Sequence, residues 1–72
     1  MCILNTNLKN YRKSKGLTQK QFAEILNIKQ SKLGSYEENR ARPTYELVIK
    51  ISDVTGHSID ELLTTDIYNS GV

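Results

Sequence analysis

The sequence predicts an all-α fold built from five short helices. Apolar residues recur at spacings of three and four, which places them on one face of a helix. Two segments, residues 18–21 and 58–61, match the capping box that opens a helix. No segment has the pattern of a strand, so we expect helices joined by short turns.

The 72 residues are expected to form one domain, because a chain of this length builds a single hydrophobic core. The core should cover about residues 4–63, with residues 64–72 as a tail or a dimer contact. The apolar fraction of 38% and the charged fraction of 25% are typical of a folded domain.

The first helix should begin at residues 4–6 and end near Lys15. Gly16 can take the left-handed conformation that often follows a helix. Cations near this end suit the negative end of the helix dipole. The apolar stripe of this helix consists of Leu4, Leu8 and Tyr11.

Thr18 is expected to cap the second helix. Gln21 completes a capping box, and Leu17 with Phe22 forms a hydrophobic staple. Asn27 should end this helix, because asparagine tolerates a positive φ better than most residues. The inner face consists of Phe22, Ala23 and Leu26.

A third helix is predicted from about Lys29 to Glu38, directly after this tight turn. At 100° per residue, its inner side around Leu33 also contains Lys29, Tyr36 and Glu37. The outer side and its flanks consist of Gln30, Ser31, Lys32, Gly34, Ser35 and Glu38.

The start of this third helix lacks the residues that usually stabilise the start of a helix. Lys29 offers no acceptor to the free amides, and Lys29 and Lys32 put cations at the positive end of the dipole, at about 0.3–1 kcal/mol each. Such a start favours an anion site, since a phosphate would meet amides and ammonium groups together. Gly34 costs roughly 1 kcal/mol relative to alanine. It either allows a close approach to DNA or has no functional role.

Pro43 closes the loop after the third helix. Thr44 should cap the fourth helix, with Gly56 just past its end. Ser58 and Glu61 open the last short helix. The apolar residues of these two helices are Leu47, Val48, Ile51, Val54, Ile59, Leu62 and Leu63.

Charge is distributed unevenly along the chain. Up to Arg42, nine basic residues stand against three acidic ones, a net charge of +6. From Pro43 onward, one basic residue stands against five acidic ones, a net charge of −4. A basic half of this density favours a polyanionic partner, because each cation set against a phosphate releases counterions. The alternative is a set of ordinary solvated helix faces.

Several classes of function are not expected. Cys2 is the only cysteine and His57 the only histidine, so we expect no disulfide, metal site or catalytic group. Cys2 is interpreted as a plain thiol and His57 as a turn residue. No cofactor, small-molecule ligand or enzymatic activity is expected. No apolar run approaches the roughly 20 residues of a membrane span, and the start lacks a signal peptide, which predicts a cytoplasmic protein.

The outer side of the third helix is predicted to contact DNA bases. Its short polar residues make it slim enough for a major groove. Gln30 is suited to a bidentate contact with adenine, and Ser31 and Ser35 can bond to several base edges. The alternative is an ordinary wet helix surface.

With these features, the sequence resembles the Cro/repressor-type (XRE) helix-turn-helix family of phages and bacteria. The resemblance covers roughly residues 4–63 and rests on LTQKQFAEIL, the apolar Leu33, YEENRARPT and SIDELL. It implies a compact, lambda-repressor-like bundle whose third helix is the recognition helix. The chain departs from the family at Asn27, where Gly is usual, and at Lys29, where Ser or Thr is usual.

Carried over by position, the resemblance implies base contacts from Gln30, Ser31 and Ser35. Gln19 would hold a phosphate through its side chain or its amide. Together with the anion site at the helix start, the remaining phosphate contacts are expected from Lys29, Lys32, Arg40 and Arg42. Arg12 and Glu37 match a structural ion pair found in several members.

The expected function is sequence-specific binding of double-stranded DNA and transcriptional regulation by a small repressor or controller. A single recognition helix reads few base pairs, so a homodimer on two half-sites is expected. The candidate dimer contacts are Ile59, Leu62, Ile67 and Tyr68. For Ile67 and Tyr68, packing back onto the core is an equal alternative. The alternative function is an adaptor or antitoxin that keeps the fold without binding DNA.

Overall fold

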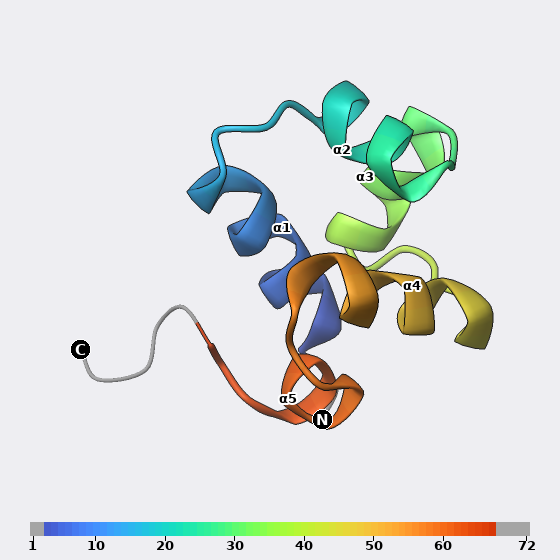
Figure 1. Cartoon of the computed structure of the whole chain (residues 1–72). Helices are drawn as coiled ribbons and strands as arrows, with labels where there is room; N and C mark the ends of the chain where they lie inside the picture. The colour runs from blue at the N-terminus through green and yellow to red at the C-terminus, as the bar shows by residue number, and fades with distance from the viewer. Residues whose placement is uncertain (1–2, 68–72) are drawn as a thin grey trace.

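In a computed structural model, the chain folds into five helices (Figure 1). The structure describes residues 3–67. The helices are α1 (Leu4–Ser14), α2 (Gln19–Leu26), α3 (Gln30–Glu37), α4 (Tyr45–Thr55) and α5 (Ile59–Thr64). Residues 3–67 contain no strand. The predicted all-α fold of five helices is confirmed.

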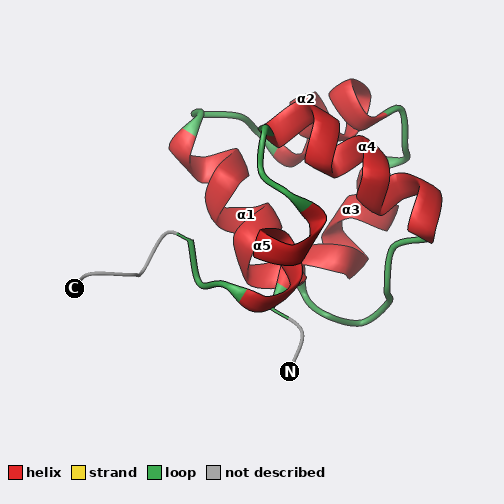
Figure 2. Ribbon diagram, turned by 60° about the horizontal axis from the view of Figure 1, so that its bottom comes forward, coloured by secondary structure: helices red, strands yellow, loops and turns green. Residues whose placement is uncertain are grey.

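The helices pack around one hydrophobic core. Phe22 of α2, Leu33 of α3 and Ile51 of α4 have no exposed surface. On the other side of the core, α5 lies against α1 (Figure 2). The other buried apolar residues are Leu4, Leu8, Ala23, Leu26, Leu47, Val48 and Leu62.

Local hydrogen bonds fix three of the helix starts, as predicted. The Gln21 N–H donates to Thr18 Oγ1 at 3.1 Å, and the Thr18 N–H donates to Gln21 Oε1 at 2.9 Å. Ser58 and Glu61 form the second capping box, at 3.1 Å in each direction. Thr44 caps α4 through its hydroxyl.

The turn between α2 and α3 is formed by residues 27–29. Asn27 takes the left-handed conformation, with φ 58° and ψ 45°. The Ile28 N–H donates to the Ala23 carbonyl at 2.9 Å, which satisfies the end of α2. The half-buried Ile28 side chain packs against the core, so the direction in which α3 leaves the turn is fixed.

The prediction that Lys29 lies on the inner side of the third helix is wrong. Lys29 is exposed and precedes the helix with an extended backbone, φ −72° and ψ 145°. The spacing of 100° per residue applies only to residues with helical dihedrals. Glu37 is buried and Tyr36 half-buried, on the side of Leu33 as predicted.

The prediction of Leu62 as a dimer contact is also wrong, because only 1% of its surface is exposed. The short α5 contacts both α1 and α4, which uses its single apolar face within the protomer. Ile59 and Ile67 are half-buried and pack against the same core. The remaining candidate, Tyr68, lies outside the described residues, as does Cys2.

A buried asparagine that the sequence analysis missed joins the two ends of the fold. Asn7 is fully buried in α1. Its Nδ2 donates to the carbonyls of Leu62 at 2.9 Å and Thr65 at 2.7 Å. Its Oδ1 accepts from the Ile67 N–H at 3.2 Å. The side chain thus satisfies carbonyls that the end of α5 would otherwise leave free.

An Asn7→Ala variant is expected to lose about 2 kcal/mol of unfolding free energy, because it leaves the buried Leu62 carbonyl and the partly buried Thr65 carbonyl without their donor. Urea denaturation followed by circular dichroism measures the loss. Asn10→Ala is the matched control, since Asn10 also lies in α1 and its side chain forms no hydrogen bond within residues 3–67. Equal midpoints for the two variants would contradict this role.

Candidate nucleic-acid interface

The tight turn presents one side of α3 to solvent. Leu33 and Glu37 are buried against the bundle, where α3 contacts α1 and α2. The opposite side begins with three exposed residues, Gln30, Ser31 and Lys32. The first amides of this helix have no intrahelical acceptor, and the N-cap residue Lys29 supplies no side-chain acceptor for them.

A buried ion pair holds α3 against α1. Arg12 Nε donates to Glu37 Oε2 at 2.8 Å, and Arg12 Nη2 donates to Glu37 Oε1 at 3.1 Å. The Arg12 side chain is 14% exposed and the Glu37 side chain 2%. Arg12 Nη1 also donates to the Leu17 carbonyl at 3.0 Å. This bidentate geometry fixes the orientation of the guanidinium, and with it the position of α3.

Gln19 is bonded into the same pair, which the sequence analysis did not anticipate. Its Nε2 donates to Glu37 Oε1 at 3.2 Å. A Cβ atom added at Gly34 would lie 3.7 Å from Gln19 Oε1, which is an ordinary van der Waals contact, so the Gln19 side chain packs directly beside Gly34 of α3. Of the two predicted routes from Gln19 to a phosphate, the side chain is engaged within the protein. Its amide, in the first turn of α2, has no intrahelical acceptor.

A shallow hollow on the outer side of α3 brings most of the predicted contact residues together. The hollow is lined by Gln19, Gln30, Ser31, Gly34, Ser35, Glu38 and Arg40. The Ser35 hydroxyl donates to the Ser31 carbonyl at 3.1 Å, which leaves its oxygen as an acceptor for another group. The three predicted base-contact residues therefore share one surface.

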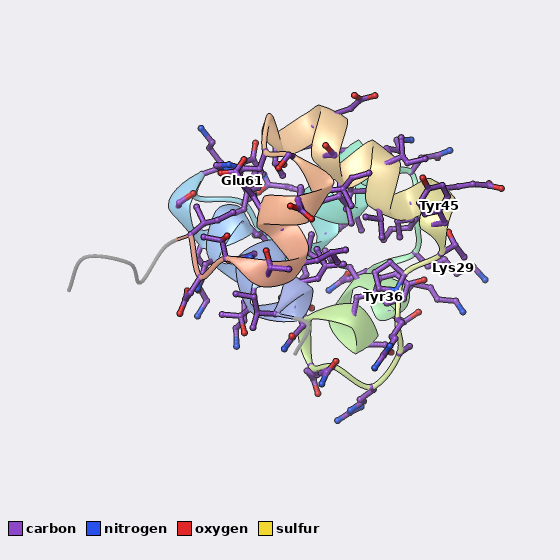
Figure 3. The ribbon with its side chains drawn as sticks, turned by 90° about the horizontal axis from the view of Figure 1, so that it is seen from below. Lys29, Tyr36, Tyr45 and Glu61 are labelled. Carbon is purple, nitrogen blue, oxygen red and sulfur yellow. The ribbon has the colours of Figure 1, made fainter. Side chains whose placement is uncertain are left out.

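Other predicted phosphate contacts lie outside this hollow. Exposed Lys29 and Lys32 lie at the start of α3. Arg42 lines a separate groove of about 630 Å³, together with Tyr36 and Pro43. In Figure 3, Lys29 lies on the same side of the molecule as Tyr45, and Glu61 lies on the opposite side.

Glu38 and Arg40 form a second ion pair that the sequence analysis missed. Arg40 Nη2 lies 2.8 Å from Glu38 Oε1, and the two side chains are 73% and 53% exposed. Asn39 between them has a positive φ of 60°. The presence of an asparagine directly after the predicted helix was the available signal for this turn.

Three other features bear on metal sites, membrane spans and the single histidine. Among residues 3–67, no three His, Cys, Asp or Glu residues lie close enough to hold a metal ion. The helices in that range are also too short or too polar to cross a bilayer. His57 Nδ1 lies 3.9 Å from Glu61 Oε1, beside the Ser58 cap.

A family model described as helix-turn-helix matches residues 8–62. The chain is 39% identical over 61 residues to YonR, a prophage-derived HTH-type transcriptional regulator of Bacillus subtilis. This match covers 85% of the chain and 56% of YonR. It is 37% identical over 60 residues to YazB, an HTH-type transcriptional regulator of the same organism, covering 83% of the chain and 87% of YazB.

The structure is similar to that of the Bacillus subtilis biofilm regulator SinR in complex with DNA. The TM-score is 0.73 and the sequence identity 31%, over 83% of this chain and 97% of the SinR chain. The chain spans about half the length of YonR and of two other curated relatives that it matches.

Proposed function

Because the chain belongs to the helix-turn-helix family of transcriptional regulators, we propose that it binds double-stranded DNA and regulates transcription. The observation that best supports this is the outer side of α3, which is solvent-exposed and lies beside the cations Lys32 and Arg40. The SinR structure was solved in complex with DNA. In this proposal, the hollow on α3 and the cations around it form the surface that contacts DNA.

In this proposal, the outer side of α3 enters the major groove. Gln30 bonds to adenine, and Ser31 and Ser35 bond to neighbouring base edges. The buried Arg12–Glu37 pair keeps α3 in one orientation, so its side chains meet the bases without reordering.

Phosphate contacts come from both ends of α3 and from α2. Lys29 and Lys32 lie beside the uncapped amides of α3, which form an anion site. The Gln19 amide and the side chains of Arg40 and Arg42 complete the set. These contacts position the protein on the duplex, and the base contacts give specificity.

The regulator acts as a homodimer in this proposal, since one α3 reads too few base pairs to select a site. Ile59 and Ile67 remain candidate contacts through their exposed fractions, with Tyr68 beyond the described residues. Residues 4–63 act as one DNA-binding domain in the cytoplasm.

Salt dependence of binding to random duplex DNA tests the proposal. Four side-chain contacts to phosphates, from Lys29, Lys32, Arg40 and Arg42, predict a log–log slope of about −3 to −4 per protomer. Affinity should therefore fall roughly 100-fold between 50 and 200 mM salt, measured by fluorescence anisotropy. Lys32→Ala should reduce the slope by about 1. Lys50→Ala, in the acidic half of the chain, is the matched control and should leave the slope unchanged.

A flat salt response of the folded protein would contradict the proposal. That result would favour a protein-binding adaptor or antitoxin, because such a function does not need phosphate contacts.

A further inference from the structure

Resting on the proposed DNA binding, we infer that Glu38 determines specificity by accepting a hydrogen bond from a cytosine amino group in the major groove. Glu38 also rejects guanine at the same position. The three residues expected to contact bases are all neutral, so this carboxylate gives the surface a different chemical preference at one end.

The position of Glu38 places it on the proposed base-facing surface. Glu38 lines the same hollow as Gln30 and Ser31, and its side chain is 53% exposed. Ser31 and Ser35 are four residues apart and share one face of α3, and Glu38, the C-cap residue, lines the same hollow beside them. Gln30 and Glu38 lie at opposite ends of this face, so they would meet different base pairs.

The local electrostatics disfavour an acidic residue at this position. Glu38 is the C-cap residue directly after α3, where the helix dipole already places partial negative charge. A carboxylate near the phosphates of a duplex is also repelled by them. Within residues 3–67, its ion-pair partner is Arg40, whose side chain is 73% exposed and can turn toward a phosphate. The carboxylate then needs a donor from the DNA.

The groups that each base presents in the major groove determine which base can donate to the Glu38 carboxylate. Cytosine presents only an amino donor at its own major-groove edge, and acidic side chains accept from it. Guanine presents two acceptors, N7 and O6, which repel a carboxylate. Adenine presents an amino group beside the N7 acceptor, so it offers a weaker match. Glu38 therefore favours cytosine and discriminates against guanine by repulsion.

Selection of bound duplexes from a random pool tests this inference, with the wild type, Glu38→Gln and Glu24→Gln compared. Glu24 is an exposed glutamate of α2 outside the hollow, so its variant is the matched charge control. The wild type and Glu24→Gln should require cytosine at one position, by at least about five-fold. In Glu38→Gln that requirement should disappear or shift to adenine, the base that an amide prefers.

A fourth variant, Arg40→Ala, separates direct contact from an indirect role. We expect it to weaken binding to all sequences and to keep the cytosine requirement. If Arg40→Ala and Glu38→Gln both lose the requirement for cytosine, Glu38 acts only by holding Arg40, and the inference is overturned.

The experiment also distinguishes failure of this inference from failure of the proposed function. A wild type that binds duplex with a steep salt slope but selects the same sequences as Glu38→Gln overturns the inference alone. A folded wild type without salt-dependent binding removes the proposed function, and the inference with it.

Discussion

An Arg12→Ala variant is expected to lose about 3–5 kcal/mol of unfolding free energy, because it leaves a buried carboxylate without its counter-charge. The Glu37 side chain is only 2% exposed, and Gln19 alone would remain as its side-chain donor. A domain of this size has roughly 4–11 kcal/mol in total. The melting temperature should therefore fall by roughly 15–30 °C. Thermal denaturation followed by far-UV circular dichroism measures this.

Arg40→Ala is the matched control for this prediction. It removes an arginine from an exposed ion pair of the same 2.8 Å length, which contributes at most about 1 kcal/mol. Adding Glu37→Gln to Arg12→Ala should recover part of the loss, because it removes the unpaired charge. Similar melting of Arg12→Ala and Arg40→Ala would show that burial adds nothing to the first pair.

A Gln30→Ala, Ser31→Ala double variant is expected to lose most of its preference among DNA sequences. Each lost base contact removes about 1–3 kcal/mol of discrimination, so the two together should lower affinity for the selected site roughly 30- to 25,000-fold. Both side chains are exposed, so the fold should be unaffected. Fluorescence anisotropy with the selected duplex and with random duplex measures the two affinities.

Affinity for random duplex and its salt slope should stay the same in this double variant, because phosphate contacts supply nonspecific binding. Lys32→Ala is the comparison, since it should weaken binding to both duplexes alike. Equal losses on both duplexes by a correctly folded double variant would contradict base contact by Gln30 and Ser31.

Short-range interactions were readable from the sequence. The capping boxes at Thr18 and Ser58 join residues three apart, so their geometry follows from the local order of residue types. The same holds for Asn27, whose left-handed backbone needs no distant partner. Spacings of three and four also predicted which faces of the helices enter the core. The identity and order of the helices thus followed from local chemistry.

Long-range contacts decided the rest. Asn7 looks like any polar helix residue until α5 brings the Leu62 carbonyl to it, 55 positions along the chain. The Gln19 side chain was one of two expected routes to a phosphate, but the packing of α2 against α3 brings it to Glu37 instead. Leu62 was expected at a dimer contact, but α1 and α4 cover it.

The sequence by itself therefore determined five helices, their caps and a basic half with a polar third helix. The tertiary structure alone decided which polar side chains are bonded within the protein and which remain exposed. The physical reason is that a hydrogen-bonding side chain has the same local pattern whether its partner is the protein, water or a ligand. Only the packing of helices distant in sequence determines which of these partners lies within reach.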